Sequence, residues 1–78
     1  MKYLKFNDKE IMTLNRSVIL FDNNIDKYME SCNCKYYNSI KYYTDCITRI
    51  YKDKSNDITY MLDIKNNKII SGKKFIKE

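Results

Sequence analysis

Residues 58–76 read ITYMLDIKNNKIISGKKFI, and this stretch decides the fold class. Its first half repeats an apolar residue at every second position: Ile58, Tyr60, Leu62 and Ile64. That period is typical of a β-strand. Asn66 and Asn67 follow, and asparagine suits a tight turn because it tolerates positive φ better than most residues. We therefore predict a β-hairpin over residues 58–76.

The two-residue turn also predicts how the hairpin is paired. Ile64 should face Ile69 and Leu62 should face Ser71, with Gly72 as a possible bulge. A two-stranded hairpin alone is barely stable in water, so it must pack against the rest of the chain. Residues 2–6 could add a third strand to it.

Upstream, the pattern becomes helical. Apolar residues recur at steps of three and four: Ile11, Leu14, Val18, Phe21, Ile25, Tyr28 and Cys32. Asn7 and Glu10 have the spacing of a capping box, and Phe6 and Ile11 that of a hydrophobic staple. We predict one helix from about residue 8 to 31, with Phe21 in the core.

A second helical pattern covers the middle of the chain. Its apolar positions are Tyr36, Ile40, Tyr43, Ile47 and Ile50, which predict a helix from about residue 35 to 53. Two long helices joined by a short connection favour an antiparallel hairpin. The predicted fold is thus a single α+β domain over residues 1–78, in which an antiparallel two-helix hairpin packs against a small C-terminal antiparallel β-hairpin.

The composition indicates the kind of genome and compartment. Ile, Lys, Asn and Tyr make up more than half of the 78 residues, while Ala, Pro, Gln, Trp and His are absent. This bias is typical of an AT-rich genome, such as that of a virus, phage or mobile element. Three cysteines fit a reducing compartment. No apolar run reaches the length of a membrane span. We expect a cytoplasmic protein that has no membrane partner.

The residue types give little support for catalysis. The chain has no histidine and a single glycine, which removes the commonest general base and any glycine-rich phosphate loop. Cys32 and Cys34 form a Cys-x-Cys pair, but Cys46 lies about 18 Å away along the predicted second helix. We expect no enzyme, no cofactor and no metal site, with Cys32 and Cys46 as small buried apolar residues.

Two surfaces are candidates for binding a partner. On the outer face of the predicted second helix, Tyr42 lies in a polar row with Lys35, Asn38, Asp45 and Arg49. On the first helix, Met12, Ile19 and Leu20 project away from the main apolar stripe. The β-hairpin, a partner protein or a second copy of the chain would have to cover these three side chains.

We therefore expect a small non-enzymatic binding protein that inhibits or modulates a larger host or cognate protein, for example an inhibitor of host defence. The alternative is a nucleic-acid-binding regulator, because the net charge is +5. It would use Lys41, Arg49, Lys52 and the lysines of the β-hairpin, among them Lys73 and Lys74. A third possibility is a structural homodimer held by the apolar back of the first helix.

Overall fold

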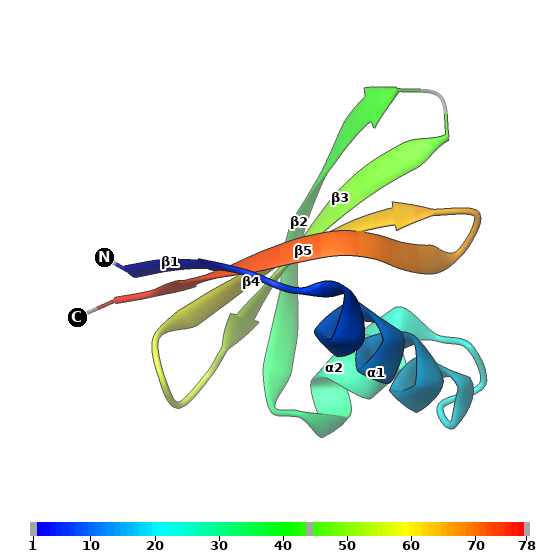
Figure 1. The fold of residues 1–78 in the computed structure, drawn as a ribbon. Coiled ribbons are helices and arrows are strands. Elements are labelled where there is room, and N and C mark those ends of the chain that lie inside the picture. The colour runs from blue at the N-terminus through cyan, green and yellow to red at the C-terminus, as the bar shows by residue number, and fades with distance from the viewer. Residues whose placement is uncertain (1, 44, 78) are drawn as a thin grey trace.

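The chain forms a five-stranded sheet with two helices packed on it (Figure 1). The computed structural model describes residues 2–43 and 45–77, without the side chains of residues 42 and 43. The elements follow in the order β1 (Lys2–Lys5), α1 (Asp8–Ile19), α2 (Ile25–Ser31), β2 (Cys34–Tyr43), β3 (Cys46–Asp53), β4 (Ile58–Lys65) and β5 (Lys68–Ile76). The predicted α+β class is confirmed, and the predicted number and arrangement of strands match only in part.

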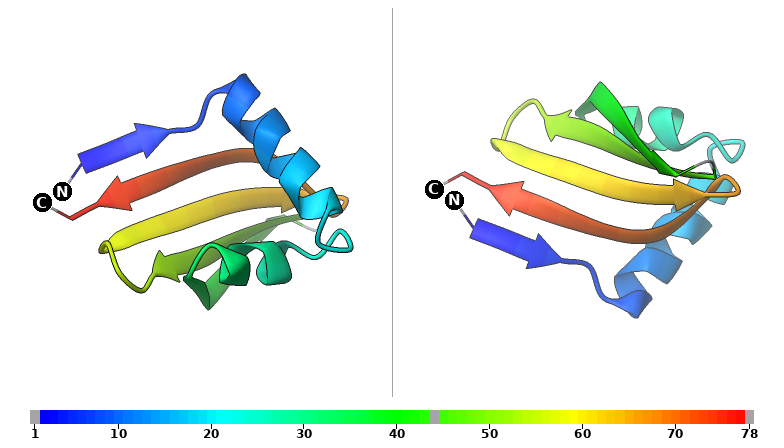
Figure 2. Two further views of the ribbon diagram at one scale, coloured as in Figure 1. Left: turned by 90° about the horizontal axis from the view of Figure 1, so that it is seen from below. Right: turned by 90° about the horizontal axis from the view of Figure 1, so that it is seen from above.

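The sheet is antiparallel throughout, in the order β1-β5-β4-β3-β2. The predicted N-terminal strand forms as β1 and pairs with β5 at one edge. Both helices lie on the same face of the sheet, and no described helix covers the other face (Figure 2).

The start of α1 is the one that the sequence predicts. The side chain of Asn7 accepts a hydrogen bond from the backbone of Glu10 at 2.8 Å, and the Glu10 carboxylate accepts one from the backbone of Asn7 at 3.1 Å. This reciprocal pair satisfies two N–H groups that the helix leaves without intrahelical partners.

The predicted single helix over residues 8–31 is instead broken into α1 and α2. Asp22 and Asn23 take left-handed backbone conformations, with φ of 58° and 55°. Asn24 then caps α2, because its side chain accepts a hydrogen bond from the backbone of Lys27 at 3.0 Å. Short polar side chains of this kind offer the backbone an alternative to the helix. The apolar stripe is therefore divided, and Phe21 lies half-buried beyond the end of α1 instead of in the core.

The predicted helix over residues 35–53 is wrong, because this segment forms β2 and β3. It is rich in tyrosine, isoleucine and threonine, which prefer strands. Register shifts between Tyr36 and Asn38 and between Lys41 and Tyr43 mark bulges in β2. A bulge places residues three apart on the same face, and the Tyr36 hydroxyl indeed donates to the Ser39 hydroxyl at 3.0 Å. The predicted apolar stripe is divided between the two faces of the sheet, because Ile47 lies opposite Ile64 on the helix side and Ile50 lies opposite Met61 on the other side.

The C-terminal hairpin forms as predicted. Asn66 and Asn67 both have positive φ, 51° and 61°, as the tight turn between β4 and β5 requires. Ile64 faces Ile69, as predicted, but Leu62 faces Gly72 instead of Ser71. The register shifts between Asp63 and Ile64, so the bulge lies before Ser71 and not at Gly72.

The core lies between the helices and the sheet. Its buried members are Val18, Ile25 and Met29 from the helices and Cys34, Tyr51, Leu62 and Ile69 from the strands. The two described helices contain 12 and 7 residues, and neither has the length and apolar character needed to span a bilayer.

Candidate binding surface

One face of the sheet carries no described helix and is here called the open face. Strand alternation shows which side chains lie on it. Leu62 packs in the core and Arg49 pairs with Asp26 of α2, so both point to the helices. Residues that alternate with them point the other way. Two rows of cross-strand partners lie there: Lys35, Lys52, Thr59, Phe75 and Tyr3, then Asn38, Ile50, Met61, Lys73 and Lys5.

Lysines lie directly opposite lysines on this face. Lys35 is the cross-strand partner of Lys52, and Lys5 is the partner of Lys73. Like charges in this position destabilise a sheet. A further pair, Lys65 and Lys68, lies beside the hairpin turn, where Asp45 offsets Lys65 at 3.6 Å. The open face therefore carries a positive charge that works against folding.

Aromatic rings accompany these lysines at both edges of the sheet. Tyr3 packs edge-on against Phe75 with 5.2 Å between ring centroids, and the Lys73 ammonium lies 5.9 Å from the Tyr3 ring. At the other edge the Lys52 ammonium lies 3.8 Å from the centre of the Tyr37 ring. Tyr3 and Tyr37 remain 52% and 61% exposed, so much of each ring is accessible to a ligand.

Acidic groups are segregated from this face. Among the described strand residues on it, Asp63 is the single acid, and its two carboxylate oxygens accept hydrogen bonds from Thr48 and Ser71. Five further acids belong to α1, α2 and their connection: Asp8, Glu10, Asp22, Asp26 and Glu30. The described strand residues of the open face thus carry an excess of lysines, whereas the helices carry carboxylates together with Lys9, Arg16 and Lys27.

A hollow of about 260 Å³ opens at the end of the sheet near the β3–β4 turn. Thr59 lies between its longer cross-strand neighbours Lys52 and Phe75, and all three line the hollow. The remaining lining residues are Asp53, Asp57, Ile58 and Lys77. Hydrogen bonds from the Ser55 backbone and the Asn56 side chain lower the pKa of Asp53, which keeps it ionised.

The predicted row around Tyr42 is divided by the strand geometry. Lys35 and Asn38 lie on the open face, whereas Arg49 points to the helices and Asp45 lies in the β2–β3 turn. The Tyr42 side chain lies outside the described residues. On a helix these positions share one face, but on a strand neighbouring positions alternate.

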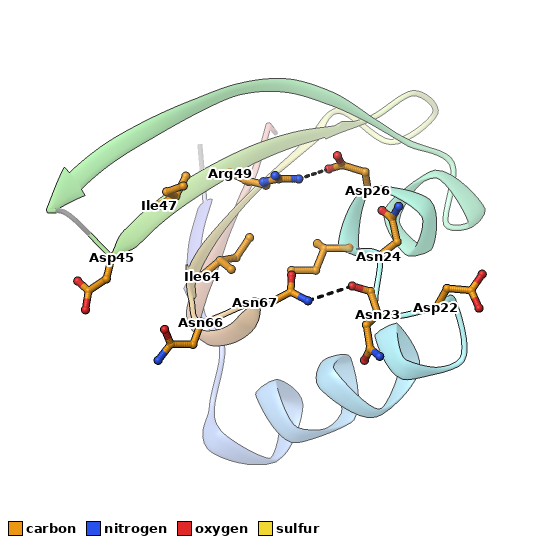
Figure 3. A pocket seen from close by; sticks show the side chains of 11 residues that line it. Asp22, Asn23, Asn24, Asp26, Asp45, Ile47, Arg49, Ile64, Asn66 and Asn67 are labelled. Carbon is orange, nitrogen blue, oxygen red and sulfur yellow. Dashed lines mark hydrogen bonds and ion pairs between the residues drawn. The ribbon is translucent and has the colours of Figure 1, made fainter.

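Arg49 contributes to a cavity of about 470 Å³ on the helix side (Figure 3). Its Nη1 atom lies 2.8 Å from Asp26 Oδ1, and the Tyr51 hydroxyl donates to the same oxygen. Across the cavity, Asn67 donates to the backbone oxygen of Asn23 at 3.4 Å (Figure 3). These contacts tie α2 and the α1–α2 connection to the sheet, which gives Arg49 a structural role.

The second predicted contact face lies on α1. Met12 and Ile19, with Leu20 just after the helix, are 54%, 61% and 82% exposed. The β-hairpin does not cover them, because α1 packs on β5 through its other side.

The cysteines differ from the prediction in burial. Cys34 is buried, whereas Cys32 is exposed and Cys46 is intermediate. All three are free thiols. Among the described residues, no three His, Cys, Asp or Glu side chains are grouped as metal ligands.

Comparison with protein-family models, curated proteins and solved structures finds no significant match. The open face therefore has to be interpreted from its own chemistry. Sequence reasoning named Lys52 and Lys73 but missed Tyr3, Lys5, Tyr37 and Phe75. The available signal was a lysine two positions from an aromatic residue near each end of the chain, in Tyr3 and Lys5 and in Lys73 and Phe75.

Proposed function

We propose that this protein is a non-enzymatic nucleic-acid-binding module that uses the open face of its sheet. The observation that carries the proposal is the pairing of Lys35 with Lys52 and of Lys5 with Lys73 on a face whose described strand residues include one acid, the hydrogen-bonded Asp63. A polyphosphate backbone is the ligand whose charge such a face complements.

The energetic argument concerns the cost of this charge. Lysines opposed across neighbouring strands repel each other and lower the free energy of unfolding. A phosphate bound between the two ammonium groups converts that repulsion into attraction and releases counterions from the nucleic acid. The surface is thus less favourable for the free protein than for its complex.

The chain also offers a matched control. Among the lysines that the sequence suggested for nucleic acid, Lys52 and Lys73 lie on the open face. Lys41 is paired with Ile47 and Lys74 with Tyr60, so both point to the helix side. Lys73 and Lys74 are neighbours in sequence, but their side chains point to opposite faces of the sheet. Comparing the two substitutions therefore separates the effect of a lysine's position from the effect of net charge.

The test is a salt titration of binding to a labelled 20-nucleotide single strand and to the corresponding duplex, followed by fluorescence anisotropy. For the single strand, the Lys52→Gln/Lys73→Gln variant should weaken binding and reduce the slope of log K against log salt by about 1.4. The Lys41→Gln/Lys74→Gln variant should retain most of the affinity. Equal losses in the two variants, or binding insensitive to salt, would contradict the proposal.

Contact with a larger protein is the second candidate, and one observation favours it. Met12, Ile19 and Leu20 form an exposed apolar set on and just after α1, which is typical of a protein-binding surface. A defined partner that binds the parent chain should then lose affinity for an Ile19→Ser/Leu20→Ser variant but not for Lys52→Gln/Lys73→Gln. Unchanged affinity of that partner for the Ile19→Ser/Leu20→Ser variant would contradict a contact through this surface.

A further inference from the structure

We infer that the ligand of the open face is single-stranded, and that one of its bases stacks in the hollow over Thr59, against Phe75. This inference rests on the proposed function, because a duplex and a single strand both satisfy the lysines. Three features of the open face distinguish them.

The first feature is the accessibility of the aromatic rings. Tyr3 and Tyr37 are 52% and 61% exposed, and Phe75 lines the hollow. Stacking on a protein ring needs a base whose own face is free. In a duplex those faces are occupied by neighbouring base pairs, whereas a single strand presents them.

The second feature is the distribution of charge around the hollow. Four ionisable side chains line it: Lys52, Lys77, Asp53 and Asp57. Their charges cancel, and the two carboxylates disfavour a phosphate inside. The uncharged Thr59 and Phe75 suit the face of a base. The phosphates would follow the opposed lysines on either side of the hollow.

The third feature is the repetition of one arrangement at both edges of the sheet. Lys5 and Lys73 accompany Tyr3 on β1 and β5, and Lys35 and Lys52 accompany Tyr37 on β2 and β3. The edges are four inter-strand spacings apart, or about 19 Å at about 4.8 Å each. Because bases stacked on one another are about 3.4 Å apart and bases stacked on protein rings are further apart, a strand crossing the sheet would occupy at most about six nucleotides.

The experiment compares single-stranded and duplex ligands for paired aromatic variants. A six-nucleotide strand carrying the fluorescent base 2-aminopurine reports stacking directly through quenching. Tyr3→Leu and Phe75→Leu should each weaken single-strand binding about tenfold and reduce the quenching, with little effect on duplex binding. Tyr36→Leu is the matched control, because Tyr36 is 45% exposed but lies on the helix side against Tyr51.

The outcomes separate the two proposals. Equal affinity for single strand and duplex, with unchanged quenching in the Tyr3 and Phe75 variants, would overturn this inference. If the lysine variants still weakened binding in that case, nucleic-acid binding itself would stand. Absence of binding to either ligand at low salt would overturn both. Thermal melting of each variant confirms that it is folded before its affinity is interpreted.

Discussion

Gly72 has a packing role that its predicted place in a bulge did not suggest. A Cβ atom added there would lie 2.7 Å from Cδ2 of Phe6 and 3.1 Å from Cδ2 of Leu62. The Phe6 backbone also donates to the Gly72 carbonyl at 2.9 Å, where the chain leaves β1 for α1. The glycine is needed because the Phe6 ring lies directly over the strand.

Gly72→Ala should therefore lower the free energy of unfolding by about 1–3 kcal/mol, since the partly buried Phe6 has to move from its place against the core. Urea unfolding measures the loss. The Phe6→Leu/Gly72→Ala double variant should lose less than the two single variants together, because the smaller side chain removes the clash. Additive losses would mean that Phe6 is not the obstacle.

Two buried groups predict how stability changes at alkaline pH. Burial raises the pKa of the Cys34 thiol from 9.0 to about 11, and burial likewise raises the pKa of the Tyr51 hydroxyl. The unfolded chain releases these protons first, so above about pH 9 the folded state holds more protons. The free energy of unfolding should then fall as the pH rises from about 9 to 11.

Urea unfolding at pH 7, 9 and 10.5 tests this sign. Cys34→Ala should be less stable at pH 7, because it loses core packing, but its stability should decline less steeply with pH. A parent and a variant with parallel pH profiles would show that the Cys34 thiol does not contribute.

At the scale of elements, the sequence predicted correctly the segments that a turn or a helix cap determines locally. The C-terminal hairpin and the start of α1 depend on local chemistry, namely the Asn66-Asn67 turn and the Asn7-Glu10 capping box. The segment over residues 35–53 repeats apolar residues at the helical period, but in the sheet that stripe is divided, with Ile47 on the helix side and Ile50 on the open face. Its strand-forming composition was the better signal, and it outweighed the period.

The break between α1 and α2 gives a prediction for this scale. Asn23 has φ of 55°, a conformation that costs an ordinary residue about 1–2 kcal/mol. Asn23→Ala should therefore lower the melting temperature, whereas Asn23→Gly should leave it unchanged or raise it. A gain of helical circular dichroism in the alanine variant would instead mean that α1 and α2 join into the single helix that the apolar stripe suggested.

At the scale of the whole molecule, the open face could not be predicted from the sequence. Its lysines and aromatic rings come from β1, from β2 and β3, and from β5, which only the pairing of distant strands brings together. Residues 1–34 carry equal numbers of basic and acidic side chains, so the distribution of charge along the chain did not indicate Lys5 as part of a basic surface. The excess of lysines on the open face arises because strand alternation sends Lys5 and Lys73 to one face while the acids of α1 and α2 stay on the other.

This arrangement predicts opposite effects on stability and on binding. Lys5→Glu places a carboxylate opposite Lys73, and Lys35→Glu places one opposite Lys52. Each change replaces repulsion by attraction and should raise the free energy of unfolding by about 0.5 kcal/mol at low salt. Each should also weaken nucleic-acid binding, because the new carboxylate repels phosphate and pairs with the lysine that would otherwise bind that phosphate. Ordinary surface substitutions that damage binding through misfolding cannot produce this combination.

This prediction is tested by measuring melting temperature and nucleic-acid affinity on the same samples at 50 mM and 500 mM salt. The gain in stability should shrink at high salt, where the lysine repulsion in the parent protein is screened. Lys41→Glu is the control, since Lys41 faces Ile47 on the helix side and has no cross-strand lysine. It should change net charge equally while affecting affinity far less than Lys5→Glu. If Lys5→Glu and Lys35→Glu stabilised the fold and left nucleic-acid affinity intact, the opposed lysines would destabilise the protein without contributing to binding. That result would contradict the proposed role of the open face.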